Sequence, residues 1–325
     1  MIRLAFLLAL LPFAASAVDQ AALMAKKPAK WLSEYGLFAD GPAQIPAKGV
    51  TPYDLATPLF SDHAEKLRFV WTPSPARYEA EEAFEFPVGS VLIKTFTYPD
   101  GAGLIETRLL IRQAAGWKAW PYVWDAEAGD ARLKLAGARF DIRHEGETIS
   151  YRVPNANQCK GCHMRGDAIT PIGPKARNLN HAFPYDEGAA NQLAAWVEKG
   201  HLDGAPDPPA SADWRRGALE ARARAYLDVN CAHCHRRDGP ASNSGLFLTY
   251  GEAERTAWGY RKRPVAAGRG SGGLEFDIAP GQPGASIMIY RMVSLEPGVM
   301  MPELGRSLPH IEGIALIREW IAAME

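Results

Sequence analysis

The feature that most constrains this 325-residue chain is a five-residue pattern that occurs twice and uses every cysteine. Each copy has two cysteines separated by two residues and followed at once by a histidine, at residues 159–163 (CKGCH) and 231–235 (CAHCH). At this spacing each of the two thiols can add to one vinyl group of a porphyrin as a thioether. The imidazole of the next residue then lies beneath the iron. The pattern therefore predicts two covalently bound haem c groups, attached through Cys159, Cys162, Cys231 and Cys234 and ligated by His163 and His235.

Other uses of paired cysteines fit this spacing less well. Four cysteines in an exported protein would ordinarily form two disulfides, but that role leaves both histidines unexplained. A zinc ribbon usually places its pairs about 15 to 20 residues apart, whereas 68 residues separate Cys162 from Cys231. A thioredoxin-like redox centre needs one motif after a βα turn, and neither motif is expected in that setting. We therefore expect thioether attachment and no disulfide.

Residues 1–17 have the three-part layout of a secretory signal peptide. An apolar run (residues 4–13) follows Arg3, and small residues precede a cleavage position after Ala17. The run is too short for the roughly 20 residues that span a bilayer. We expect a mature protein that begins at Val18, lies in the periplasm and has no membrane span.

The charge balance argues against a nucleic-acid partner. Without the signal segment the chain keeps 35 basic and 37 acidic side chains. Nucleic-acid binding usually requires a clearly basic surface. Redox proteins, one donating and one accepting electrons, are the expected partners.

The fold class is predicted as α+β, beginning with a β-rich, sandwich-like domain over residues 18–154. Residues 88–98, 105–112 and 117–124 are rich in β-branched and aromatic side chains and are separated by turns that contain glycine. Residues 140–153 alternate apolar and polar around the turn Glu145-Gly146-Glu147, which predicts a hairpin. The first motif follows almost directly, in a haem-binding segment over residues 155–210.

An all-α domain is expected over residues 211–325, after a linker rich in proline and alanine at 203–213. Asp213 is expected to cap a helix that has one apolar face and leads to Cys231. Isoleucines recur at steps of three and four from Ile311 to Ile321, which predicts an amphipathic helix at the end of the chain.

A helix entering the attachment motif and a helix closing the chain resemble the small class I cytochrome c domain. The sequence Met300-Met301-Pro302 lies just before the closing helix, where that family carries its distal methionine. The resemblance implies Met301 as the second ligand of the second iron, with Met300 as the alternative.

A wider resemblance covers nearly the whole mature chain. It is carried by residues 32–38 (LSEYGLF), 53–62 (YDLATPLFSD), 86–90 (FPVGS), 105–108 (IETR) and 225–235 (AYLDVNCAHCH). These stretches are similar to a family of exported bacterial diheme c-type cytochromes with an N-terminal β-rich region. The resemblance implies this architecture and no particular physiological role.

The sixth ligand of the first iron is less constrained. We rank His181 first, because the preceding loop is polar, contains glycine and proline, and could fold back over a haem. His201, His63 and His144 are the alternatives. His233, inside the second attachment loop, is expected at the surface.

The leading functional hypothesis is a periplasmic electron carrier, either on its own or as the cytochrome component of a dehydrogenase system. The alternative is a diheme peroxidase in which the first iron keeps an open position for hydrogen peroxide. A third possibility is a β domain that binds a small molecule or protein, with the haems as its redox outlet. No catalytic side chains are predicted, since the sequence contains no Gly-rich phosphate loop and no recognisable Ser-His-Asp arrangement.

Overall fold

The computed structural model describes residues 17–99, 101–265 and 267–325. The predicted signal peptide therefore lies, except for Ala17, outside the described residues. Within them, fourteen strands form five antiparallel sheets, and seven α-helices lie between and after these sheets. No helix of the described part has the length and apolar character needed to cross a bilayer.

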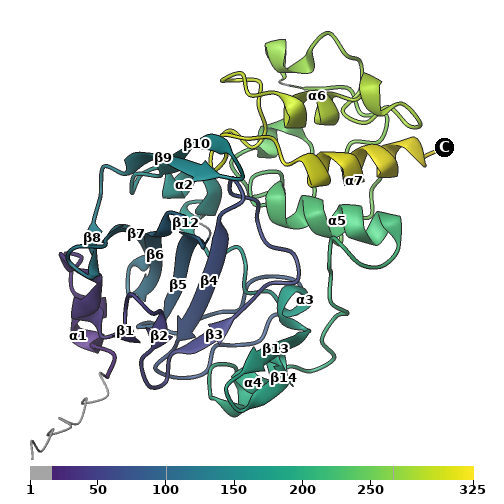
Figure 1. The fold of residues 1–325 in the computed structure, drawn as a ribbon. Helices are drawn as coiled ribbons and strands as arrows, with labels where there is room; N and C mark the ends of the chain where they lie inside the picture. Colours follow the sequence, from purple (N-terminus) through teal and green to yellow (C-terminus); the bar gives the residue numbers. More distant parts are fainter. Residues whose placement is uncertain (1–16, 100, 266) are drawn as a thin grey trace, which may run out of the picture.

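The largest sheet has six antiparallel strands in the order β3-β4-β5-β6-β7-β8, with each strand beside its neighbour in sequence (Figure 1). Alternating side chains give it two different faces. The strands are β3 (Thr51–Tyr53), β4 (Glu65–Trp71), β5 (Val91–Tyr98), β6 (Gly103–Gln113), β7 (Gly116–Asp125) and β8 (Asp130–Leu133).

One face of this sheet carries a continuous apolar core. Val91 and Ile93 of β5 lie there beside Leu109 and Ile111 of β6. Leu23 of α1 (Gln20–Met24) and two side chains of η1 (Leu32–Tyr35) cover this face. The buried hydroxyls of Tyr35 and Tyr122 lie 2.9 Å apart, so the polar groups inside this core are paired.

The opposite face carries two separate apolar clusters. One contains Leu92 and packs against Trp196, and the other contains Phe96 and packs against Tyr151. Charged side chains of β4, β5 and β6 lie between them along the strands.

Two-stranded hairpins and short helices surround the large sheet. The hairpins are β1 (Phe38–Asp40) with β2 (Ile45–Pro46), β9 (Ala138–His144) with β10 (Glu147–Val153), β11 (Met164–Arg165) with β12 (Ala168–Ile169), and β13 (Ala182–Tyr185) with β14 (Gly188–Asn191). The helices of this half are α2 (Cys159–His163), α3 (Ala176–Leu179) and α4 (Gln192–Glu198).

The C-terminal region, residues 211–325, has its own apolar core between α5 (Leu219–Asn230) and α7 (Ile311–Ala322), which lie side by side in Figure 1. The helices approach so closely that a Cβ at Gly313 would lie 2.3 Å from the Tyr226 hydroxyl oxygen. Only glycine fits there. The other elements are α6 (Ile287–Val293) and the 3₁₀ turns η2 (Ser242–Ser244), η3 (Gly268–Ser271) and η4 (Pro283–Ala285).

The structure contradicts the predicted fold class in both halves. The N-terminal half has one large sheet with separate small hairpins, where the sandwich prediction requires two large sheets packed face to face. Residues 211–325 do not form an all-α cytochrome c-like domain: the described part has three α-helices there, joined by long stretches of turns and 3₁₀ segments. Glycine and proline interrupt regular structure between residues 231 and 286, because they favour turns over helix.

Several local predictions are confirmed. β5, β6 and β7 coincide with the three strands expected from composition, and β9 and β10 form the expected hairpin. The closing helix is α7. The helix expected to begin at Asp213 begins instead at Leu219, because the Asp213 carboxylate accepts from the Arg215 amide in a preceding turn.

Candidate cofactor-attachment site

The first motif forms α2, directly after the β9–β10 hairpin. The Asn155 side chain opens this turn by accepting from the backbone amides of Asn157 and Gln158 at 3.0 and 2.9 Å. The β11–β12 hairpin then returns Thr170 to His163. The His163 Nδ1–H donates to the Thr170 carbonyl at 2.8 Å, and the Thr170 amide donates to the His163 carbonyl at the same distance.

This pair of hydrogen bonds prepares His163 as a metal ligand. A carbonyl oxygen can only accept, so Nδ1 carries the hydrogen and Nε2 keeps its lone pair. Burial, together with the nearby positive charge of Lys94, lowers the pKa of His163 to about 4. The imidazole is therefore neutral near pH 7, which is the form that binds a metal through Nε2.

The second motif begins where α5 ends, with Cys231 as the C-cap. His235 Nδ1 lies 3.3 Å from the hydroxyl oxygen of Ser244. That hydroxyl donates to the Ala241 carbonyl at 2.7 Å, so its oxygen accepts from the imidazole. Burial lowers the pKa of His235 to about 4. Both motif histidines therefore carry their hydrogen on Nδ1 and keep a lone pair on Nε2.

The two motifs contact each other although 67 residues separate them in sequence. The Cys234 thiol donates to the Gly161 carbonyl at 3.4 Å, and it lies close enough to Cys162 to influence the pKa of that thiol. The neighbouring Cys234 thiol and His233 imidazole lower the pKa of Cys162. One attachment cysteine of each motif therefore lies at a shared boundary.

Four charged residues hold the motifs together at this boundary. Arg165, two residues after the first motif, pairs with Glu82 and Asp238 at 3.1 and 3.0 Å. Arg236, the residue after the second motif, pairs with the same two carboxylates at 2.6 Å each. Two cations and two anions in alternation stabilise one another more than an isolated surface pair does.

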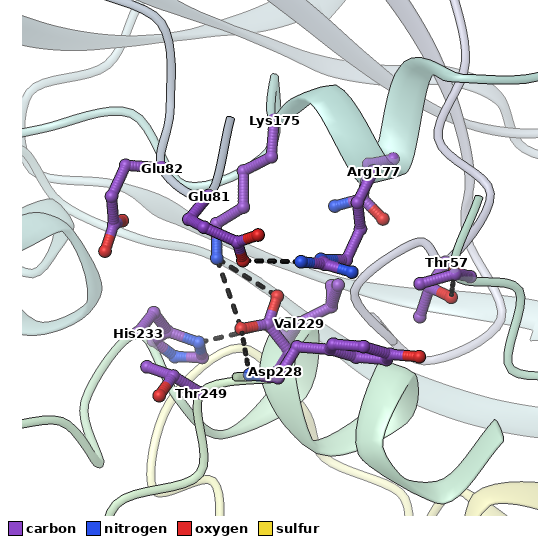
Figure 2. Close-up of polar contacts among 12 residues, drawn as sticks. Thr57, Glu81, Glu82, Lys175, Arg177, Asp228, Val229, His233 and Thr249 are labelled. Atoms are coloured by element: carbon purple, nitrogen blue, oxygen red, sulfur yellow. Dashed lines mark hydrogen bonds and ion pairs between the residues drawn. The ribbon is translucent and has the colours of Figure 1, made fainter. Parts of the chain in front are cut away.

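His233 lies at this boundary and not at the surface, so the prediction for it is wrong. Its side chain is 7% exposed. Its Nδ1 donates to the Val229 carbonyl at 3.2 Å, as Figure 2 shows. The short attachment loop turns the side chain back onto α5, a packing that the sequence pattern alone does not reveal.

A buried ion pair ties the end of α5 to the N-terminal half (Figure 2). The Lys175 ammonium donates to both carboxylate oxygens of Asp228, at 3.0 and 3.2 Å, and neither side chain is more than 9% exposed. Asp228 also accepts from the Tyr250 amide at 3.1 Å. Nearby, Arg177 pairs with Glu81 at 2.5 Å.

A cavity of about 620 Å³ opens beside this pair and is lined by the same charged groups. Because Lys175, Arg177 and Asp228 are already paired, the lining offers a ligand no uncompensated charge of theirs. We interpret the cavity as a consequence of the structural ion pairs.

The segment YDLATPLFSD, residues 53–62, joins the sheet to the C-terminal region. The Asp62 carboxylate accepts from the amides of Ser307 and Leu308 at 2.8 and 2.9 Å and from the Ser307 hydroxyl at 2.8 Å. The Asn230 side chain accepts from the Phe60 amide at 2.8 Å. This segment therefore positions both the second motif and the loop that contains Met301.

The loop with Met300 and Met301 lies near both motifs. The Met301 amide donates to the carbonyl of Arg291, whose positive charge acts on His235. Further along the loop, Leu304 lies 3.0 Å from where a Cβ of Gly161 would be. Both methionines are partly buried. The placement keeps Met301 as the proposed ligand of the second iron and does not distinguish it from Met300.

The histidines considered for the first iron have partners elsewhere. His181 contacts the Gln192 side chain at 3.1 Å. His201 is bonded through both ring nitrogens, to Thr51 and Thr72. His63 and His144 stack on each other with ring centroids 5.7 Å apart. Within the described part of the chain, none of the four makes a hydrogen bond or ring contact with the first motif.

The donor set of the two motifs fits covalent haem attachment. All four cysteines are free thiols and each is partly buried. Among residues 17–99, 101–265 and 267–325, no three His, Cys, Asp or Glu side chains are grouped so as to hold a bare metal ion. A c-type haem needs no such group, since two thiols hold the porphyrin and one imidazole ligates its iron. No family model, curated protein or solved structure matches the chain.

Proposed function

We propose that the protein is a periplasmic diheme c-type cytochrome that transfers electrons between redox partner proteins. The observation that carries the proposal is the contact between two complete attachment motifs, made through Cys162, Cys234 and Gly161. When bound, haem would supply a one-electron iron couple at each motif. The adjoining attachment points favour transfer between the two groups inside one chain.

The chain's own residues have clear roles in this proposal. Cys159, Cys162, Cys231 and Cys234 hold the porphyrins, and His163 and His235 ligate the irons. Met301 is the proposed second ligand at the second iron, and His181 remains the candidate ranked first for the first. Thr170 and Ser244 fix the orientation of the two proximal imidazoles.

Export is part of the same proposal. The chain is packed into the fold from the proposed cleavage position onward: Val18 contacts the sheet core, and the Asp19 amide donates to the Tyr35 carbonyl at 2.9 Å. N-terminal sequencing of the protein from the periplasm should begin at Val18.

Mass spectrometry of the denatured protein tests the cofactor directly. Co-expression with a haem-attachment system should yield a chain carrying two haem masses. The double variant Cys159→Ser/Cys162→Ser should keep one haem, and Cys231→Ser/Cys234→Ser should keep the other. A native chain with the mass of four thiols or two disulfides and no haem would refute the proposal.

A diheme peroxidase is the second candidate, favoured by one observation. The four histidines that could complete the first iron are engaged with other groups. An iron without a sixth side-chain ligand can accept hydrogen peroxide. Electron paramagnetic resonance of the oxidised protein distinguishes the two: a persistent high-spin signal with rapid peroxide turnover selects the peroxidase, and two low-spin signals select the carrier.

A further inference from the structure

A row of positive charges crosses the large sheet on the face that carries the two separate apolar clusters. Arg68 on β4, Lys94 on β5 and Arg108 on β6 are directly opposite one another in the strand register. Lys66, two residues before Arg68, points to the same face. The row runs between the two apolar clusters described above.

Like charges directly opposite each other destabilise a sheet, so such a row needs compensating anions. Arg68 pairs with Asp54 at 3.1 Å. Arg108 pairs with Glu106, a carboxylate that is fully buried and also accepts from the Tyr151 hydroxyl at 2.6 Å. The two arginines are thus individually neutralised.

The two lysines, in contrast, form no ion pair within the described residues. In the described part of the chain, Lys94 makes no hydrogen bond or ion pair, and its ammonium lies 5.0 Å from the ring centre of Phe96. Lys66 donates only to the Ala64 carbonyl, at 2.9 Å. Burial, reinforced by Arg108 and Arg68, lowers the pKa of Lys94 to about 7, and the pKa of Lys66 is also lowered by burial. Both lysines are partly buried, and a desolvated lysine without an anion tends to lose its proton unless a ligand supplies the missing negative charge.

The first attachment motif lies against this row. The charge of Lys94 acts on both His163 and Cys162, and that of Arg108 acts on Cys159. The β11–β12 hairpin that follows the motif packs its second strand on β7 of the same sheet. A group attached at the first motif therefore lies beside Lys94, which has no ion-pair partner in the described part of the chain.

We propose that Lys94 and Lys66 bind the carboxylates of the group attached at the first motif, which are the propionates of haem c. This inference rests on the proposed function and adds a specific anion site on the sheet. The paired Arg68 and Arg108 flank Lys94 in the strand register. The second motif, set in the helical core, has a different environment.

The test compares Lys94→Gln with Lys94→Arg and with Lys118→Gln, which removes an exposed positive charge from β7. Loss of the Lys94 charge should stabilise the oxidised state of the first haem. We expect at least a tenfold change in its redox equilibrium constant, about 59 mV for one electron, with a steeper dependence on pH as the propionate becomes titratable. Lys94→Arg and Lys118→Gln should stay within threefold of the native protein.

Two outcomes would overturn the anion site. One is an unchanged first-haem potential in Lys94→Gln. The other is a low-spin to high-spin change in Lys94→Arg, which would make Lys94 an iron ligand instead. If Lys94→Gln does not fold, Lys66→Gln replaces it and should shift the same potential in the same direction.

Mass spectrometry of the same samples separates failure of the site from failure of the proposed function. A native chain without haem refutes both. A native chain with two haems, whose potentials respond to neither lysine, refutes the anion site alone.

Discussion

The two attachment motifs share a pattern but occupy very different surroundings. The first is a single helical turn between hairpins, with a charged sheet face beside it. The second ends a 12-residue helix in an apolar core, and Cys231 packs directly against that core. If both motifs carry haem as proposed, these unlike environments should give the two irons different potentials, because charge and burial around a haem tune its potential.

The largest expected difference is in stability. Cys231→Ser/Cys234→Ser should destabilise the protein by about 4 kcal/mol or more, since loss of the group exposes the core around α5 and α7. Cys159→Ser/Cys162→Ser should cost about 2 kcal/mol or less, because the main sheet core lies on the opposite face. Thermal unfolding followed by circular dichroism measures both, and equal losses would break the comparison.

The ion pair between the two halves comes next. Lys175→Met leaves the Asp228 carboxylate buried without its cation, which should cost about 3 kcal/mol. Arg263→Ala is the control, because it removes an exposed pair with Glu275 and should cost less than about 1 kcal/mol. Chemical denaturation measures both. A Lys175→Met loss no larger than the control's would show that the halves are joined by other contacts.

Acid should weaken the N-terminal half through His201, which is 4% exposed. Burial lowers its pKa from 6.5 to about 4. The unfolded chain therefore binds a proton first as the pH falls below 6.5, so stability is complete above that value and declines down to about pH 4. The shift corresponds to about 3 kcal/mol.

Replacing His201 with glutamine should make the stability less dependent on pH. It should also lower the stability at pH 7, since the Thr51 and Thr72 hydroxyls lose their hydrogen bonds to the imidazole. Denaturation midpoints at pH 7, 5.5 and 4.5 measure the slope. A variant as acid-sensitive as the native protein would assign the effect to other histidines.

A smaller effect is expected at the second iron. Met301→Ala should lower the potential of the second iron, because a thioether ligand favours reduced iron. The equilibrium constant for reduction should fall about tenfold, roughly 1.4 kcal/mol. The near-infrared sulfur-to-iron band should vanish. Met300→Ala is the matched control; if it removes the band instead, the ligand is Met300.

The smallest expected effect concerns Ser244. Ser244→Ala removes the acceptor of the His235 Nδ1–H and makes the imidazole a weaker donor to iron. The potential of the second haem should rise. The equilibrium constant for its reduction should increase about threefold, roughly 0.6 kcal/mol. The first haem, whose His163 uses a backbone acceptor, should not respond. A titration in which both potentials move would contradict this.

The sequence predicted individual strands and helices better than it predicted how they pack together. The residue pattern along one segment says little about distant segments. A composition rich in β-branched and aromatic residues identified β5, β6 and β7, and alternation identified the β9–β10 hairpin, because both signals depend on neighbouring residues. Neither signal could show that these strands form one sheet and a separate hairpin, since pairing between distant strands depends on register. The all-α expectation for residues 211–325 failed because it extended two helices across a stretch that glycine and proline keep in turns.

The candidate site divides in the same way. The spacing of cysteine and histidine predicts six attachment and proximal residues, and in the structure each of the two histidines has a hydrogen-bond partner at Nδ1. The row of positive charges was not predicted, because the sequence alone does not show that Arg68, Lys94 and Arg108 become neighbours across three strands. Lys94 stands within the apolar run VLIKTFTY, and this interruption is the only sequence signal of the row.

The contact between Cys162 and Cys234 has a consequence for the order of events during biogenesis. A chain that folds before its thiols have reacted with porphyrin brings these two sulfurs together in an oxidising compartment. A thiol oxidant would then join them in a disulfide, which blocks one attachment point of each motif. If the proposed haem attachment is correct, it therefore has to precede the final packing of the two motifs against each other.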